Sequence, residues 1–448
     1  MDEPRARGER LLREVKEESL AELLHTLHHL HVPPPASPKY EPLGIKPLDD
    51  ILRVFQQRSH TSTYAPSAEG AATFTPRLPV LEITSFSSAD GKTHLLYYIT
   101  ALAILPGTYH GIALPGRNGA IVFLDTDCRF DAVRLREVAR GIVLERAAEQ
   151  GILLLSGNGR GSGGRDEDEE LNKMLHTALS HVHVFRPQSS GSLLATIRSV
   201  ESYLLNDTVG GEYKHASHSR PLHAILLDSA SAFYWQDRRE LEILNIPGVR
   251  EERARARKDN EDGNDNDNNS NNNNKNNNTP PSQLPHQIIH ALRELQHTFS
   301  CPLVFTTWGL LPVTPRISSA SRPDTLSHVP TITPLYRAHR MSFRPHLPRP
   351  WPSFPTCRVI VQRDVVRPFA PFLTMEEVRG EAEERQEVVR RGRVVGWVDG
   401  NGLGWERERE RERERQAMAE RVFGFSLTEG GGIRWLDGNA DADGDGEG

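Results

Sequence analysis

Short apolar runs alternate with longer helix-like runs along residues 78–308. The apolar runs are typical of buried strands and lie at 78–85, 120–127, 181–187, 222–229 and 301–308. The runs between them have helical spacing and lie at 92–105, 131–150, 191–205 and 284–299. Strands that are apolar throughout and alternate with helices are typical of a parallel sheet covered on both faces. We therefore predict an α/β fold with a mostly parallel central sheet.

Changes in composition divide the 448-residue chain into three parts. Residues 1–40 contain a short helical pattern that ends at a run of prolines, and residues 41–312 contain the alternating core. Two low-complexity stretches, 156–170 and 251–281, interrupt that core. They have little apolar surface to bury and are predicted to be disordered insertions. Residues 313–448 begin with a basic, proline-rich segment and end in an acidic tail.

Strand-like patterns return in the last part of the chain, at 358–366, 392–398 and 423–436. The last of these has Gly430-Gly431-Gly432 between two apolar runs, which is the form of a β-hairpin. Between them, Glu and Arg alternate at 405–415, which places opposite charges three residues apart but like charges four apart. That segment is at best a solvated helix, whereas the terminal runs predict a C-terminal hairpin extension.

The composition is that of an intracellular, soluble protein. Hydrophobic residues make up 37% of the chain and charged residues 25%, enough for a sizeable core. Cys128, Cys301 and Cys357 are far apart, so neither a disulfide framework nor a zinc site is indicated. No apolar run reaches the roughly 18 residues of a membrane span, so no membrane contact is expected. The net charge is -6, so any contact with nucleic acid must come from a local basic segment.

A Gly-Lys-Thr triplet, Gly91 to Thr93, lies between the first predicted strand and the helix that follows it. In phosphate-binding loops the backbone amides cradle the phosphates, the Lys reaches the outer phosphates and the hydroxyl coordinates Mg²⁺. Gly91, Lys92, Thr93 and the adjacent His94 are therefore candidate ATP-binding residues. The full motif has an earlier glycine where this chain has Phe86, so the triplet alone is a weak signal.

Aspartates end two other predicted strands. Asp228 ends the run HAILLD and is placed to hold Mg²⁺ together with Thr93. Asp125 and Asp127 end the strand at 120–127. Ligands of open α/β sheets bind at the carboxyl ends of the strands, so these residues are predicted to converge at one edge. The alternative for Asp228 is a buried strand that ends in a capping aspartate.

Three segments resemble the RecA-like recombinase superfamily: LGIKPLDDIL at 43–52, FLDTDCRFDAVRL at 123–135 and LLDSASAFYWQDR at 226–238. The patterns DTD-x-x-F-D-x-x-R-L and SAFYW are the specific ones, and they resemble the eukaryotic recombinase paralogues in particular. The resemblance covers residues 41–312 without the insertions and, more weakly, the strands at 423–436.

This resemblance implies a RecA-like P-loop ATPase core in a nuclear protein that acts in homologous recombination and double-strand break repair. The expected cofactors are ATP and Mg²⁺. The expected partners are other recombinase paralogues, with the D-type paralogue as the direct one, and single-stranded or branched DNA.

The chain departs from the superfamily at positions that hydrolysis needs. Phe86 replaces the first loop glycine, and its side chain would obstruct phosphate if the backbone needed a positive φ there. Asp90 adds a negative charge next to the anion. By the resemblance, Asp127 is the catalytic candidate in place of a water-activating Glu, and Trp308 replaces a Gln that senses the γ-phosphate. An indole has no acceptor.

We therefore expect a degenerate ATP site with weak or absent hydrolysis, in a subunit that holds partners. One alternative is an active DNA-dependent ATPase of the same superfamily. Another is an unrelated P-loop NTPase that shares only the phosphate loop.

A basic segment at 313–350 is the candidate DNA-binding element. It follows the strand after which recombinases place a DNA-binding loop, and it has a single acid, Asp324. Its candidate DNA-binding residues are Arg316, Arg322, Arg337, Arg340 and Arg344, with Tyr336 and Phe343 interspersed. Arginines that neutralise phosphates and aromatic rings that stack on bases suit single strands. The alternative is a disordered basic linker.

Overall fold

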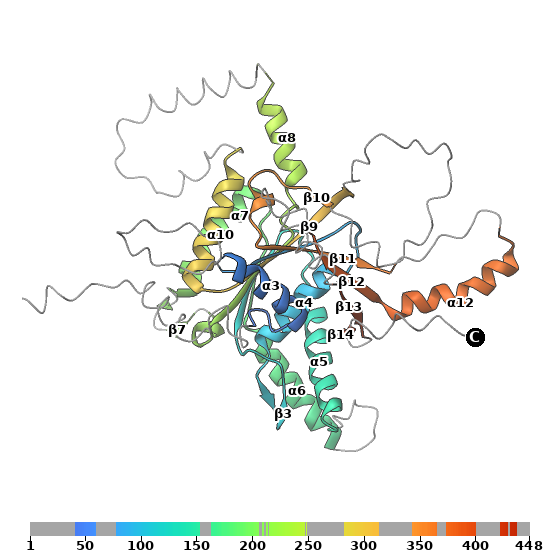
Figure 1. The fold of residues 1–448 in the computed structure, drawn as a ribbon. Helices are drawn as coiled ribbons and strands as arrows, with labels where there is room; N and C mark the ends of the chain where they lie inside the picture. Colours follow the sequence, from blue (N-terminus) through green and yellow to red (C-terminus); the bar gives the residue numbers. More distant parts are fainter. Residues whose placement is uncertain are drawn as a thin grey trace, which may run out of the picture.

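The computed structural model describes residues 41–59, 78–152, 163–205, 208–209, 212–213, 215–246, 248, 282–312, 343–364, 373–399, 422–428 and 431–436. The predicted strands join in a ten-stranded sheet with the order β14-β13-β12-β11-β1-β9-β8-β4-β5, and β10 pairs with β9 (Figure 1). The predicted α/β class with a mostly parallel sheet is confirmed.

The central strands are parallel. They are β1 (Val80–Ser85), β4 (Ala120–Asp125), β5 (Val182–Phe185), β8 (Leu222–Asp228) and β9 (Leu303–Pro312). Every residue of β1 and β4 is buried, because helices cover both faces of the sheet at this point. Their carboxyl ends therefore meet at one edge.

Helices form a layer on each face of the sheet (Figure 1). The apolar side chains of α4 (Lys92–Ile104), α5 (Ala132–Glu149) and α6 (Gly163–Leu179) pack in one core. Those of α7 (Ser190–Leu205) and α10 (Leu284–Phe299) pack in the other. The side chains of a strand alternate between the two cores, since successive residues point to opposite faces.

The segment LGIKPLDDIL leads into a helix, α3 (Lys46–Ser59), that packs in the same core as α4. Asp49 in its first turn accepts hydrogen bonds from the amides of Leu43 (2.9 Å) and Ile45 (2.8 Å). Burial raises the pKa of Asp49 to about 7, and the two amides oppose that shift. This carboxylate holds the turn that precedes the helix.

The C-terminal strands extend the central sheet. β11 (Cys357–Arg363) is parallel to β1, and β12 (Arg393–Val398), β13 (Val422–Leu427) and β14 (Ile433–Leu436) continue antiparallel. The predicted terminal hairpin is confirmed, since β13 and β14 pair with Leu427 opposite Ile433.

Four of the described α-helices were not predicted, namely α3, α6, α8 and α12, and the last two project from the sheet layer (Figure 1). α12 (Met375–Arg391) lies between β11 and β12 and begins with a capping box of Thr374 and Glu377. α8 (Tyr234–Leu244) follows β8 and buries none of its residues. Neither has the continuous apolar stripe that marks a helix in sequence, because neither packs closely on the core.

Part of the predicted insertion 156–170 is helical, which corrects that prediction. Helix α6 begins at Gly163 and continues through the acidic run. Glu169 pairs with Lys173 one turn later, at 2.9 Å, and such i,i+4 pairs favour a helix. The remaining described elements are short: β2 (Thr108–Tyr109), β3 (Ile112–Ala113), β6 (Thr208–Val209), β7 (Glu212–Tyr213), η1 (Ala216–Ser219), β10 (Phe343–Pro345) and η3 (Trp351–Ser353).

Several predictions lie outside the described residues: the helical pattern within 1–40, the insertion 251–281, and the Glu/Arg alternation at 405–415. Among the residues that the structure does describe, no helix is long and apolar enough to cross a membrane.

Candidate functional site

The predicted phosphate loop joins β1 to α4. Gly91 is the N-cap of the helix and has a φ of 89°, a left-handed conformation that glycine adopts without steric cost. Lys92 is the first helical residue. The first amides of a helix have no intrahelical acceptor, so the end of α4 presents unpaired N–H groups. This is the local geometry that binds phosphate.

The ammonium of Lys92 is held close to the end of β1. Its Nζ donates a hydrogen bond to Oγ of Ser85. Burial lowers the pKa of Lys92, while the charges of Asp90, Asp228 and Asp127 oppose that shift. The lysine therefore lies among carboxylates at the carboxyl edge of the sheet.

The structure brings Thr93 and Asp228 together. The hydroxyl of Thr93 donates to Oδ2 of Asp228 at 2.8 Å and so joins the first turn of α4 to the end of β8. The other carboxylate oxygen accepts a hydrogen bond from Thr306 on β9. Burial raises the pKa of Asp228, and the two hydroxyls and Lys92 oppose the shift. A hydroxyl and a carboxylate at this distance are hard oxygen donors of the kind that Mg²⁺ prefers.

The two aspartates of β4 have different roles. Asp125 pairs with Asp228 in the sheet register, and its carboxylate accepts from the amides of Arg129 (2.9 Å) and Phe130 (3.0 Å). It thus holds the turn after the strand. Asp127 is half-buried beside this edge, and its pKa is raised by burial and by the charge of Asp228. Asp127, the catalytic candidate, is the more accessible of the two.

Two expectations about the loop are altered. Phe86 does not have a positive φ, and its side chain is 54% exposed; the left-handed residues are Ala89 (φ 66°) and Gly91. The obstruction expected at position 86 assumed a positive φ, and the backbone does not have one there. Asp90 is 5% exposed and accepts from the amides of Ser87 (2.9 Å) and Arg363 (3.2 Å). Its carboxylate fastens the loop to β11.

His94 does not lie with the other candidates. It is buried, and its imidazole contacts the backbone of Gly431 in the terminal hairpin. A Cβ added at Gly91 would touch Val394 at 3.4 Å and Phe425 at 3.6 Å. The C-terminal strands therefore pack directly against the first turn of α4. This contact was not visible in the sequence because residue 94 and the hairpin are far apart along the chain.

A group of aromatic residues at the same end of the sheet was missed. Tyr234, Trp235 and His346 contact one another with ring centroids 5.1–5.4 Å apart, and Trp235 is 60% exposed. The guanidinium of Arg238 lies over the Trp235 ring at 5.6 Å. In the sequence, the SAFYW segment stands out only for its resemblance. Ser231 and Phe233 of this segment are buried, whereas Trp235 is exposed because α8 projects from the sheet.

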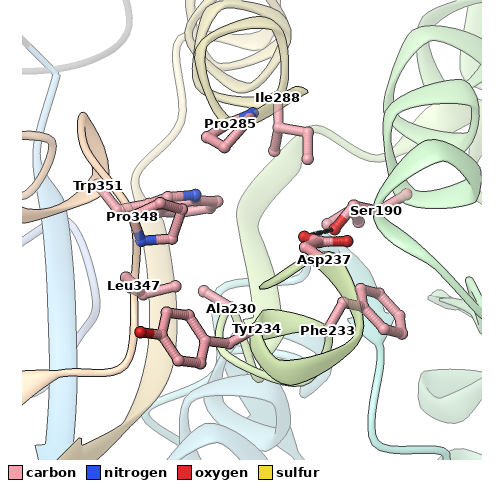
Figure 2. Close-up of a pocket in the computed structure, with 11 residues that line it drawn as sticks. Ser190, Ala230, Phe233, Tyr234, Asp237, Pro285, Ile288, Leu347, Pro348 and Trp351 are labelled. Carbon is pink, nitrogen blue, oxygen red and sulfur yellow. Dashed lines mark hydrogen bonds between the residues drawn. The ribbon is translucent and has the colours of Figure 1, made fainter. Parts of the chain in front are cut away.

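A pocket lies beside this group (Figure 2). Its walls are mostly apolar and come from α7, the start of α8, α10 and the segment before β11. Asp237 and Ser190 meet in it, with Oγ of Ser190 donating to Asp237 at 2.6 Å. Burial raises the pKa of Asp237, and that hydrogen bond opposes the shift. The pocket is separate from the phosphate loop.

Most of the predicted DNA-binding arginines lie outside the described residues, namely Arg316, Arg322, Arg337 and Arg340. Arg344 belongs to β10, which pairs antiparallel with β9. The described residues therefore place only the end of the basic segment, next to the strand that carries Thr306 and Trp308.

A nucleotide with Mg²⁺ fits the residues present at this edge. The start of α4 offers amides and Lys92 an ammonium for phosphate, and Thr93 and Asp228 offer the oxygen donors for the metal. The structure thus brings together all the predicted cofactor residues except His94.

Comparisons with known proteins find relatives over part of the chain. No protein-family model matches the chain. A DNA repair protein XRCC2 homolog of Arabidopsis thaliana is 30% identical over 168 residues, which are 36% of this chain and 42% of that protein. The DNA repair protein XRCC2 of Mus musculus is 32% identical over 149 residues, 33% of this chain and 38% of that protein. The chain thus matches well under half the length of these curated relatives.

The SAFYW and DTD segments most resemble one recombinase paralogue, X-ray repair cross-complementing protein 2, and both relatives carry that name. The predicted resemblance is confirmed over about a third of the chain.

Proposed function

We propose that the protein is a DNA repair factor that works as a subunit of a recombinase-paralogue complex in homologous recombination, in the nucleus. The observation that carries this proposal is the similarity to the plant and mouse relatives. The contact of Thr93 with Asp228 supports a RecA-type nucleotide edge within that subunit. The direct partner proposed is the D-type paralogue.

The nucleotide proposed for this edge is ATP with Mg²⁺. Lys92 and the amides at the start of α4 would hold the phosphates, and Thr93 with Asp228 would hold the metal. A bound Mg²⁺ would neutralise phosphate charge. The protein supplies little else for hydrolysis, because Asp127 is shorter than a Glu and Trp308 provides no acceptor. Weak turnover or none is the expected behaviour.

DNA binding is proposed for the aromatic surface of Tyr234, Trp235 and His346, together with the arginines that begin at Arg316. Exposed rings stack on unpaired bases, and arginines neutralise phosphates, so single-stranded or branched DNA is the substrate that this surface suits. Binding should weaken steeply as salt rises; an affinity that does not change with salt would contradict the proposal.

The test of the main proposal is purification of the full-length protein, under a mild tag, from cells that make the recombinase paralogues. The D-type paralogue is expected to copurify, and absence of every recombinase paralogue would overturn the proposal. The variant Lys92→Ala tests whether the nucleotide edge is needed: a subunit that mainly holds partners retains them.

One observation favours an active DNA-dependent ATPase as a second candidate. Asp127 lies half-buried next to Asp228 with a raised pKa, which is suited to a group that accepts a proton from water. The two candidates differ in phosphate release with and without single-stranded DNA. Turnover that Lys92→Ala abolishes would establish the ATPase, whereas release at background level supports the partner-holding subunit.

A further inference from the structure

Trp308 lies beside the lysine of the phosphate loop. It is directly opposite Ser85 in the parallel pairing of β9 with β1. Paired residues of neighbouring strands point to the same face, so the indole and the Ser85 side chain are on one side of the sheet. Oγ of Ser85 in turn accepts the hydrogen bond of the Lys92 ammonium. The indole therefore stands next to the group that reaches for outer phosphates.

The side chains proposed to hold the metal meet the face of β9 that carries Trp308. Two residues before Trp308, and on the same face, Thr306 donates to Asp228, which also accepts from Thr93. Thr306 and Trp308 thus follow one another along β9, one at the proposed metal position and one beyond it. A third phosphate would extend into the space beside the indole.

The backbone of Trp308 is held on both sides. Its amide donates to Oγ of Ser231 at 3.0 Å, and its carbonyl accepts from the amide of His346 at 3.2 Å. The side chain remains 50% exposed. An indole is bulky, and its one N–H is a donor with no acceptor. At the position where a recombinase would have a residue that senses the γ-phosphate, this chain has a bulky, largely apolar side chain on a hydrogen-bonded backbone.

The charge at this edge also disfavours a third phosphate. Lys92 is the cation of the loop, and Asp90, Asp127 and Asp228 all act on it. Each further phosphate adds negative charge to a place where one ammonium already faces these three carboxylates, and Mg²⁺ offsets only part of it. Two phosphates can be held by the amides of α4 and Lys92 without extending past them.

We propose that this edge is a nucleoside diphosphate site, and that Trp308 is the residue that prevents preference for the triphosphate. This inference rests on the proposed nucleotide site and narrows its lasting ligand from ATP to the diphosphate. The protein would then keep a diphosphate nucleotide as a lasting component and would not switch state with hydrolysis.

The experiment is calorimetric titration of the full-length protein with Mg-ADP, with the imido analogue of Mg-ATP, and with Mg-pyrophosphate. The unaltered protein should bind ADP at least as tightly as the triphosphate analogue. Trp308→Gln should shift the ratio of the two affinities toward the triphosphate by about tenfold, and Trp308→Ala by less, because it removes the bulk without adding a polar group.

Met375→Gln is the control, since Met375 is also an exposed apolar side chain and lies at the start of α12, which projects from the sheet layer; its ratio should equal that of the unaltered protein. A tenfold preference of the unaltered protein for the triphosphate would overturn the inference, and so would a ratio that Trp308→Gln leaves unchanged. Absence of all nucleotide binding would overturn the nucleotide site itself, and binding that Lys92→Ala does not weaken would show that the ligand lies elsewhere.

Discussion

Two clusters of charged residues lie on opposite faces of the central sheet. Each has two carboxylates and one cation, but the clusters differ in burial and in hydrogen bonding. The edge cluster is Lys92, Asp127 and Asp228, with the hydroxyls of Thr93 and Thr306. The interior cluster consists of fully buried charges, namely Glu82 on β1, Arg358 on β11 and Asp399 after β12, with the hydroxyl of Thr307. Thr306 and Thr307 are neighbours on β9. Thr306 donates to Asp228 in the edge cluster, and Thr307 donates to Glu82 in the interior cluster.

The interior cluster is paired within itself. Arg358 donates to Glu82 at 2.8 Å and to Asp399 at 3.4 Å, and Thr307 donates to the other oxygen of Glu82 at 2.8 Å. Burial opposes the charge of Arg358, but Glu82 and Asp399 outweigh it and raise the pKa of the guanidinium. These contacts join β9, β1, β11 and the end of β12, so this cluster stabilises the sheet.

The edge cluster likewise has two carboxylates and one cation, but it lies at the open ends of the strands. Its oxygens face one another at Thr93 and Asp228, an arrangement that a divalent cation would complete. The comparison indicates that a charged cluster in a sheet is structural when its carboxylates are hydrogen-bonded to its own buried cation. It is a candidate binding site when it lies at the open strand ends and its cation and carboxylate bond to hydroxyls instead.

The largest expected effect is in the interior cluster. Arg358→Met leaves Glu82 and Asp399 buried without their cation and should lower the free energy of unfolding by about 3–5 kcal/mol. Urea unfolding followed by circular dichroism measures the loss. Arg146→Met is the control, because its ion pair with Glu149 is exposed and should contribute less than about 1 kcal/mol. Equal losses in the two variants would contradict a structural role for the interior cluster.

Stability measured as the pH is lowered tests which titratable groups set its pH dependence. Burial, with a smaller effect of Arg117, lowers the pKa of His223 to about 4, against about 6.5 in the unfolded chain. The unfolded state therefore binds more protons between these values, so stability is complete above pH 6.5 and is lost as the pH falls toward 4. Raised carboxylate pKa values, as in Asp228, act in the opposite direction.

Between pH 7.5 and pH 5, the His223→Leu variant should lose about 1–2 kcal/mol less stability than the unaltered protein. Urea midpoints at the two pH values measure it. His290→Leu, on the exposed face of α10, leaves the buried histidine in place and serves as the comparison. A midpoint difference that His223→Leu does not reduce would show that other groups cause the acid sensitivity.

A substitution in the edge cluster should change nucleotide affinity more than the free energy of unfolding. Asp228→Asn keeps the size of the side chain and removes a buried charge, so the free energy of unfolding should change by less than about 1 kcal/mol. The dependence of nucleotide affinity on Mg²⁺ should fall at least tenfold, because the carboxylate proposed to hold the metal is lost. Titrations with and without EDTA measure it. A loss of stability as large as that of Arg358→Met would make Asp228 a structural residue.

The smallest effect concerns the loop backbone. Ala89 has a φ of 66°, where a side chain costs energy and glycine does not, so Ala89→Gly should stabilise the protein by about 0.5–1 kcal/mol. Phe86→Gly is the matched change at a residue without positive φ, and it should give no such gain. Thermal unfolding of both variants measures the change in stability. An equal effect of the two substitutions would contradict the assignment of backbone strain to position 89.

The parallel core and its edge could be predicted from local patterns. Strands such as β4 and β8 are apolar throughout and end in aspartate, and a topological rule then places those ends together. The helices α8 and α12 could not be predicted, because they project from the core and lack an apolar stripe. Helix α6 as a whole was missed, because it begins in a glycine-rich and acidic sequence that is also typical of disorder.

The sequence by itself determined the α/β class and the order of the core strands along the chain, and it predicted that Lys92, Thr93 and Asp228 meet at one edge of the sheet, because these depend on periodicity and on residue type. Only the tertiary structure decided what surrounds them. It placed His94 under the terminal hairpin, joined Asp90 to Arg363, and brought Trp308 beside Ser85. Those contacts join residues far apart in the chain, and the pairing of strands, which no local pattern encodes, sets them.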